Sequence, residues 1–214
     1  MKVLTYPCGP IQANTYILYA EGQPNCLVID PADGKKITKA IQDIGLTCTH
    51  ILLTHGHFDH VWGVKAVKEA TGAPVYMSRE DLDLVSGKGP FFSAMQQVLK
   101  PFAPDVFIGE GDMIEAAGLK LRVLDCPGHT KGGLSFVVEG EKAVFTGDTL
   151  FRESIGRTDF PGGSIQELMD SVFKKLFVLP EDTVVYPGHE GVTTIGHEKE
   201  CNPLVKYKDH PWFS

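Results

Sequence analysis

The sequence predicts an α/β fold, and three observations lead to this prediction. Short apolar runs rich in β-branched residues recur along the chain, segments with a helical period lie between some of them, and four runs lead into short motifs that contain histidine or Gly-Asp. Each run is bounded by glycine, proline or aspartate, as short strands usually are. The predicted strands are residues 15–20, 26–29, 51–53, 75–77, 119–124, 134–138, 143–145 and 184–186.

The connections between these strands carry two further signals. Residues 134–138 and 143–145 are separated by only four polar or glycine residues, which predicts a β-hairpin. Apolar residues recur with a period near 3.6 in three other segments, and this period predicts helices. The helical segment that ends near Phe177 begins with a Ser-x-x-Glu capping box. The predicted helices are residues 35–44, 61–70 and 164–177.

Size and charge limit the classes of partner. The chain has 214 residues, which suits a single domain spanning residues 1–214. Its formal net charge is −7 and its lysines are scattered, so a nucleic-acid partner is disfavoured. The N-terminus lacks the apolar core of a signal peptide, and no run approaches a membrane span in length. We therefore expect a cytoplasmic protein that acts on a small molecule without a membrane, and the oligomeric state stays open.

The cysteine pattern favours reduced thiols. The count is odd, the spacing is wide and there is no C-x-x-C pair, which argues against a disulfide framework and a zinc knuckle. Cys126 lies three residues before His129, but a buried apolar role is the preferred interpretation over a metal ligand. The five cysteines are Cys8, Cys26, Cys48, Cys126 and Cys201.

Residues 87–105 have the least regular pattern in the chain. Phe91, Phe92 and Phe102 lie in this segment and could line a substrate site. Large apolar side chains are more often buried for stability, so we expect them to pack in a core.

The strongest chemical motif directly follows the predicted strand 51–53. His55, His57, Asp59 and His60 fall within six residues, and imidazole and carboxylate groups are ligands that suit zinc or iron. Side chains two positions apart on an extended segment point the same way, so His55 and His57 can hold one metal. Asp59 and His60 come after the bend and can turn toward a second metal. Without metals, so many polar groups would compete for partners.

Three more candidate ligands each follow an apolar strand and a glycine: His129, Asp148 and His189. Glycine allows a sharp backbone turn, so each side chain can emerge at the end of its strand. Four strands ending this way would deliver ligands to one rim of the β-structure. Alone, Asp148 could be an ordinary turn residue, and only the other motifs make it a ligand. The remaining histidines, His50, His197 and His210, are expected to be ordinary surface or core residues.

The motifs together resemble those of the metallo-β-lactamase superfamily, and within it the glyoxalase II-like (hydroxyacylglutathione hydrolase-like) proteins. They are His-x-His-x-Asp-His at 55–60, Pro-Gly-His-Thr at 127–130, Thr-Gly-Asp-Thr-Leu-Phe at 146–151 and Tyr-Pro-Gly-His-Glu at 186–190. The resemblance implies an αββα sandwich with metals at one edge of two sheets. It also implies one metal held by His55, His57 and His129, a second held by Asp59, His60 and His189, and Asp148 as a bridge.

The resemblance further implies a hydrolase with two divalent metal ions, zinc in the first place, with iron or manganese as alternatives. Zinc lowers the pKa of bound water to about 7, so a metal-bound hydroxide can attack a carbonyl. Asp59 and Asp148 would orient this hydroxide as catalytic residues. The expected substrate is a thiolester such as S-lactoylglutathione.

The resemblance to glyoxalase II is less complete for the substrate-binding residues than for the metal ligands. Arg157 matches a basic residue that contacts glutathione in glyoxalase II, and a guanidinium suits a carboxylate. A structural salt bridge with Asp159 is the equal alternative for Arg157. Glyoxalase II has tyrosine where this chain has Asp159 and Gly191, and the short stretch after His189 predicts no C-terminal helical domain.

Two other functions remain open. Gly-Arg-Thr-Asp-Phe, at residues 156–160, is also similar to the loop of the persulfide dioxygenases, which use one iron at positions matching His55, His129 and Asp148. The full set of seven ligands favours a dinuclear hydrolase over that mononuclear enzyme. A non-catalytic metal-binding protein is the third class, and it is disfavoured because a structural zinc site is closed and four-coordinate.

Overall fold

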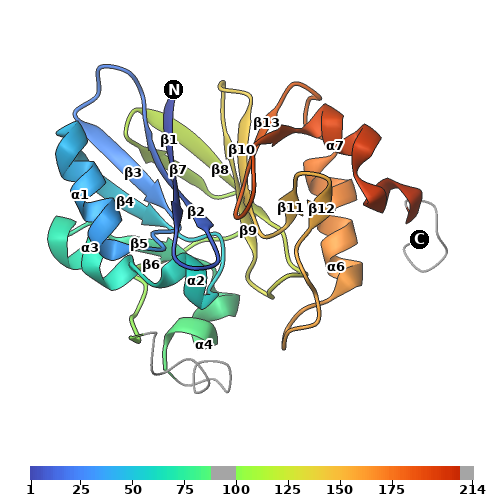
Figure 1. Ribbon diagram of the computed structural model, residues 1–214, viewed down its shortest axis with the longest axis horizontal. Helices are drawn as coiled ribbons and strands as arrows, with labels where there is room; N and C mark the ends of the chain where they lie inside the picture. The colour runs from blue at the N-terminus through green and yellow to red at the C-terminus, as the bar shows by residue number, and fades with distance from the viewer. Residues whose placement is uncertain (88–99, 208–214) are drawn as a thin grey trace.

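The computed structural model describes residues 1–87 and 100–207, and within them two six-stranded sheets lie face to face (Figure 1). In spatial order the first sheet contains β1 (Lys2–Cys8), β2 (Ala13–Tyr19), β3 (Asn25–Ile29), β4 (Thr47–Leu52), β5 (Val75–Met77) and β6 (Val106–Phe107). The second contains β14 (Thr193–Thr194), β13 (Val184–Pro187), β10 (Ala143–Gly147), β9 (Leu134–Val138), β8 (Leu119–Asp125) and β7 (Met113–Ala116). A separate hairpin consists of β11 (Leu150–Phe151) and β12 (Ser154–Ile155).

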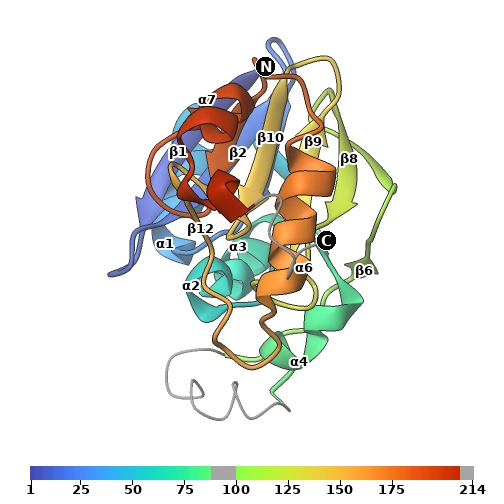
Figure 2. The same cartoon turned by 90° about the vertical axis from the view of Figure 1, so that its right-hand side faces the viewer.

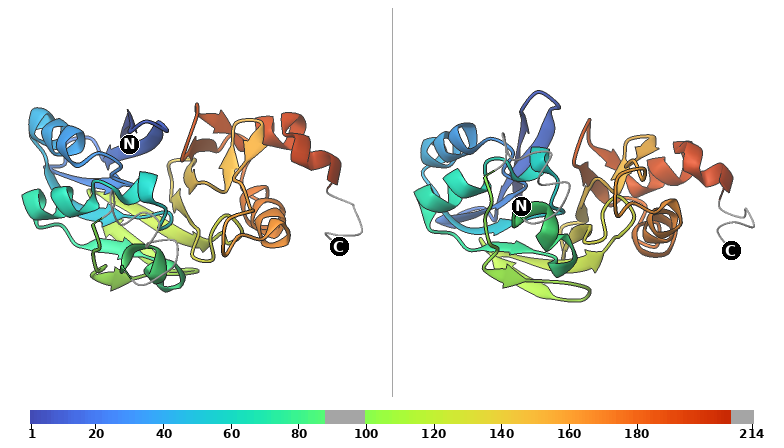
Figure 3. Two further views of the ribbon diagram at one scale, coloured as in Figure 1. Left: turned by 60° about the horizontal axis from the view of Figure 1, so that its bottom comes forward. Right: turned by 90° about the horizontal axis from the view of Figure 1, so that it is seen from below.

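Helices cover the outer faces of both sheets, so the layers run helix, sheet, sheet, helix (Figure 3). α1 (Gly34–Ile44) and α3 (Val64–Thr71) lie on the first sheet. α6 (Ile165–Asp170), its π-helical continuation Ser171–Leu176 and α7 (Ile195–Cys201) lie on the second (Figure 2). The remaining short helices are α2 (Phe58–Val61), η1 (Arg79–Asp81), α4 (Leu82–Val85) and η3 (Pro203–Tyr207). No helix of the described segments is long and apolar enough to span a bilayer.

Three apolar cores separate these layers. The central core lies between the sheets and includes Leu27, Leu121 and Phe145, all fully buried. The two outer cores lie between each sheet and its helices and include Ile37 and Val172. Every residue of β9 and β10 is buried, because both faces of these strands are covered. The predicted αββα sandwich is therefore confirmed.

Each predicted strand and helix has a counterpart in the structure, and two of the predicted helices differ from theirs in form. The expected helix 61–70 is divided into α2 and α3 at Gly63, whose N–H donates to the Pro31 carbonyl at 2.7 Å. A Cβ at Gly63 would lie only 2.5 Å from that oxygen, so this position touches the neighbouring loop. The expected helix 164–177 begins as predicted, with Ser164 Oγ accepting from the Glu167 N–H at 3.3 Å, and becomes π-helical from Ser171.

The structure also tests the predictions made for the five cysteines and for Phe102. All five cysteines are free thiols, and Cys126 is fully buried in the outer core of the second sheet. Burial raises the pKa of the Cys126 thiol to about 12, which keeps it protonated and inert. Phe102 packs against the outer core of the first sheet, so its predicted core role is confirmed. Phe91 and Phe92 lie outside the described residues.

Candidate metal centre

The seven sequence-predicted ligands are brought together at one edge of the sandwich. They lie on four segments, each of which follows a strand of one of the two sheets, so four strand ends contribute to one cluster. His55 and His57 follow β4, Asp59 and His60 lie on α2, His129 follows β8, Asp148 follows β10 and His189 follows β13.

The first group consists of His55, His57 and His129. One potential ligand atom from each lies within 4.8 Å of the others, and His57 Nδ1 is 2.8 Å from His129 Nε2. Burial, reinforced by the charge of neighbouring His129, lowers the pKa of His57 to about 3. Burial likewise lowers the pKa of His55. Neutral imidazoles are the form that binds a metal ion.

The second group consists of Asp59, His60 and His189 and is gathered as closely as the first. Its ligand atoms also lie within 4.8 Å of one another. Asp59 Oδ2 is 3.3 Å from His189 Nε2, and the Nε2 atoms of His60 and His189 are 3.3 Å apart. This group adds a carboxylate to two imidazoles, a donor set suited to zinc, iron or manganese.

Asp148 lies between the two groups and reaches both. Its Oδ1 atom is 3.3 Å from His60 Nε2, and its Oδ2 atom is 3.4 Å from His129 Nε2 and 3.6 Å from His189 Nε2. Burial alone would raise the pKa of Asp148, but His60 and the other histidines outweigh it and lower that pKa. A carboxylate in this position can bridge two cations.

Two observations show that the residues fit bound metal ions. In the described part of the chain, the buried atoms His55 Nε2 and Asp148 Oδ1 have no hydrogen-bond partner, although buried polar atoms normally have one. Burial would lower the pKa values of His60 and His189, yet the adjacent carboxylates of Asp148 and Asp59 raise them. A divalent cation would take the place of the protons that these carboxylates attract.

Asp30 supports both groups, although it is absent from the ligand motifs of the sequence. Its Oδ1 accepts from the Thr54 N–H at 2.7 Å, and its Oδ2 accepts from Thr54 Oγ1 at 2.6 Å and from His60 Nδ1 at 3.0 Å. Because the Thr54 hydroxyl donates to Asp30, it accepts from His55 Nδ1 at 3.0 Å. Both imidazoles therefore carry hydrogen on Nδ1 and present Nε2 to a metal. Asp30 lies near enough to His55 and His60 to be a ligand, but its oxygens are already engaged.

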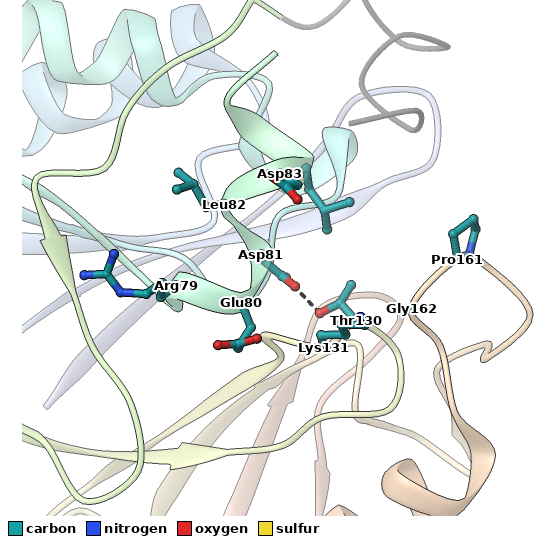
Figure 4. Close-up of a pocket in the computed structure, with 10 residues that line it drawn as sticks. Arg79, Glu80, Asp81, Leu82, Asp83, Thr130, Lys131, Pro161 and Gly162 are labelled. Carbon is teal, nitrogen blue, oxygen red and sulfur yellow. Dashed lines mark hydrogen bonds between the residues drawn. The ribbon is translucent and has the colours of Figure 1, made fainter. Parts of the chain in front are cut away.

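Asp81 is a second buried carboxylate that lies outside the ligand motifs of the sequence. It accepts from the Gly56 N–H at 2.9 Å, from Thr130 Oγ1 at 2.8 Å and from the Gly132 N–H at 2.7 Å. Figure 4 shows it beside Thr130, at the edge of a surface hollow of about 480 Å³. These bonds tie together the two loops that carry His57 and His129.

Asn14 holds the loop that carries His189. Its side-chain amide donates to the carbonyl oxygens of Pro187 at 3.0 Å and Glu190 at 2.9 Å. Asn14 is buried at the start of β2, so this contact joins the first sheet to the ligand loop of the second.

A cleft of about 560 Å³ opens over the ligands. Its walls are mostly apolar, and Arg157 lies on its rim. The Arg157 Nε and Nη2 atoms both donate to Asp159 at 2.7 Å, so the salt-bridge alternative for Arg157 is present in the structure. The side chains lining the cleft are Ile11, His57, Phe58, Asp59, His129, Asp148, Phe151, Ser154, Ile155, Arg157, Phe160, His189 and Glu190.

The remaining histidines lie apart from this cluster where they are described. His50 stacks on Tyr76 with ring centroids 5.2 Å apart. His197 Nε2 is 3.0 Å from Glu153 Oε1 on the protein surface. His210 lies outside the described residues.

The sequence of residues 8–189 matches the family described as the metallo-beta-lactamase superfamily, and the chain belongs to that family. It is similar to the probable metallo-hydrolase YqgX of Bacillus subtilis, with 37% identity over 96% of this chain and 98% of the relative. It is also similar to the hydroxyacylglutathione hydrolase GloC of Haemophilus influenzae, with 33% identity over 97% of this chain and 100% of the relative.

Solved structures show the same likeness. The BLEG-1 B3 metallo-beta-lactamase superposes with a TM-score of 0.87 at 33% identity, covering 95% of this chain and 99% of its own. TTHA1623 in a di-iron-bound form gives 0.83 at 38% identity, covering 94% and 100%. ETHE1 from Myxococcus xanthus gives 0.79 at 29% identity, covering 98% and 91%. The chain is thus a metallo-hydrolase-like member of the superfamily with a candidate metal site.

Proposed function

We propose that the protein is a dinuclear metallohydrolase that cleaves thiolesters such as S-lactoylglutathione. The observation that carries the proposal is the second ligand group: Asp59, His60 and His189 are gathered as closely as the first group, and Asp148 reaches both. A mononuclear centre would not need this second group. The similarity to GloC, named a hydroxyacylglutathione hydrolase, supports the thiolester class.

The residues divide the chemical work in a simple way. When bound, two divalent metals supply a nucleophile from water at neutral pH and polarise the attacked carbonyl. His55, His57 and His129 would hold one metal, Asp59, His60 and His189 the other, and Asp148 both. Asp59 and Asp148 would also accept hydrogen bonds from the attacking water and orient it. A thiolate leaves without a protonating residue more readily than an amine, because thiols have pKa values near 8.5.

A persulfide dioxygenase is the second candidate. The loop 156–160 resembles that class, and the structural similarity to ETHE1 favours keeping it. Such an enzyme would use His55, His129 and Asp148, and the structure also brings these three together. It would leave four of the seven gathered side chains without a metal to bind: His57, Asp59, His60 and His189.

Metal analysis combined with a substrate panel tests the choice. The protein would be purified after expression with added zinc, iron or manganese, and then assayed with S-lactoylglutathione and with glutathione persulfide under oxygen. We expect close to two metal ions per chain, zinc in the first place, and thiolester hydrolysis. One iron per chain that added zinc does not displace, with oxygen uptake on the persulfide, would move the protein to the dioxygenase class.

A further inference from the structure

The guanidinium group that lines the cleft is already paired with a carboxylate of the protein itself. Arg157 is the only lysine or arginine among the described residues that line the cleft. Two of its nitrogens donate to the two carboxylate oxygens of Asp159, and its guanidinium carbon lies 3.9 Å from the ring centroid of Phe160. The guanidinium is therefore paired along one edge and covered on one face.

A substrate carboxylate would have to compete with Asp159 for this guanidinium. Asp159 is only two residues away along the chain, so its effective concentration at Arg157 is in about the millimolar range or above. Hydrogen bonding to Arg157 lowers the pKa of Asp159 to about 2, so this competitor is ionised throughout the physiological range. A free anion in solution is at a disadvantage against it.

The remaining walls of the cleft suit an apolar ligand. Five of the lining side chains are aromatic or aliphatic: Ile11, Phe58, Phe151, Ile155 and Phe160. Ile11 is half exposed at 51%, although burying such a side chain against a ligand is favourable. Glu190 also lines the cleft and would repel an anion at close range.

We propose that Asp159 determines substrate specificity: by holding Arg157, it makes the cleft prefer thiolesters of apolar, uncharged thiols over thiolesters of glutathione. This inference rests on the proposed thiolester hydrolysis and names the substrate class within it. S-lactoylglutathione is then a substrate that binds weakly, because its glutathione carboxylates find Arg157 engaged.

Three lactoyl thiolesters that differ only in the thiol provide the test. The thiols are glutathione, N-acetylcysteamine and 2-phenylethanethiol, and kcat and KM are measured with the metal-loaded protein. For the wild type we expect the highest kcat/KM with the phenylethyl ester and the lowest with the glutathione ester. Asp159→Asn frees Arg157 and should raise the ratio of glutathione to N-acetylcysteamine kcat/KM by about two- to fivefold, the range of an exposed ion pair. The increase in kcat/KM for the glutathione ester should come from a lower KM.

Two controls separate this effect from a general change in charge. Asp182→Asn removes the same charge from another exposed ion pair, with Lys142, and should leave the ratio unchanged. Adding Arg157→Ala to Asp159→Asn should cancel the gain, because the freed guanidinium is then missing. An unchanged ratio in Asp159→Asn, or a wild type that prefers the glutathione ester, overturns the inference.

Binding of S-hexylglutathione, which cannot be hydrolysed, tests the inference independently of turnover. Calorimetry should show tighter binding to metal-loaded Asp159→Asn than to the wild type, by about the same factor. If none of the three esters is hydrolysed, the proposed function fails while this measurement still decides the role of Asp159. Equal dissociation constants in the two proteins overturn that role.

Discussion

Gly188 and Asp148 are in direct steric contact: a Cβ atom at Gly188 would lie 2.1 Å from Asp148 Oδ1. The same Cβ would lie 2.8 Å from Cε1 of His60. Gly128 precedes His129 and Gly147 precedes Asp148, and these two glycines have positive φ values of 127° and 50°. The φ of Gly188 is not positive. The first two glycines allow a turn, as the sequence predicts. Gly188 is required for space, because the Asp148 carboxylate occupies the volume that a side chain would fill.

Gly188→Ala should therefore damage the metal centre without disturbing the backbone conformation. The added methyl group must displace Asp148, so we expect the bound metal to fall well below two per chain and activity to drop by about 100-fold or more. Gly191→Ala is the matched control, because a Cβ there meets nothing within 4 Å. Metal content by elemental analysis and circular dichroism on both variants make the comparison. Full metal loading of Gly188→Ala would contradict the steric argument.

Much of the candidate site could be read from the sequence because its signals are local. The spacing of His55, His57, Asp59 and His60 directly after an apolar run placed a metal site at a strand end, and the structure gathers these residues there. The same Gly-then-ligand pattern pointed to His129, Asp148 and His189. The buried strands were recognisable because continuous apolar runs are needed where both faces are covered.

The supporting carboxylates were missed because their role depends on distant contacts. Asp30 directly follows the predicted strand 26–29, as the ligands follow theirs, and this position was its one available signal. Asp81 lies in a short acidic segment whose composition is typical of an exposed surface. In the structure it accepts hydrogen bonds from the N–H groups of Gly56 and Gly132. The exposed strand β1 also escaped prediction, because its pattern includes a lysine and a proline and is only partly buried.

Asp148→Asn should lose more activity than the loss of any ligand that serves one metal. Removing the bridge weakens both sites and leaves two cations facing each other with less neutralising charge. We expect metal content below one ion per chain and a loss of activity of about 100-fold or more. His197→Asn is the control, since His197 contacts Glu153 on the surface and no ligand. Equal effects at the two positions would show that the ligands are misassigned.

Asp81→Ala should destabilise the fold and not only the site. The substitution leaves the buried Gly56 N–H, Gly132 N–H and Thr130 hydroxyl without their acceptor. Buried donors left without partners cost about 1–3 kcal/mol each before relaxation, so we expect a loss of about 2–4 kcal/mol. Thermal and urea unfolding measure it, with the exposed neighbour Asp83→Ala as control. A change below about 0.5 kcal/mol would mean that water replaces the carboxylate without cost.

Glu198 stabilises the β11–β12 hairpin, which forms one wall of the cleft. Its carboxylate is fully buried and accepts from the Glu153 N–H at 2.8 Å, from Thr193 Oγ1 at 2.6 Å and from Asn202 Nδ2 at 2.8 Å. Asn202 also donates to the Ser154 carbonyl at 3.1 Å. Glu198 and Asn202 thus hold the turn between β11 and β12, the hairpin whose residues line the cleft.

Glu198→Ala should release this hairpin and affect substrate binding more than metal binding. Phe151 and Ile155 are placed by the hairpin, so we expect KM for thiolesters to rise several-fold, about three- to tenfold, with a smaller change in kcat. The seven candidate ligands lie on other segments or before the turn, so the metal content should stay that of the wild type. Glu200→Ala, on an exposed site of the same helix, is the control. Steady-state kinetics and metal analysis decide. Metal loss with unchanged KM would place the effect of Glu198 at the ligands, because a loosened wall cannot lower metal content while leaving substrate affinity intact.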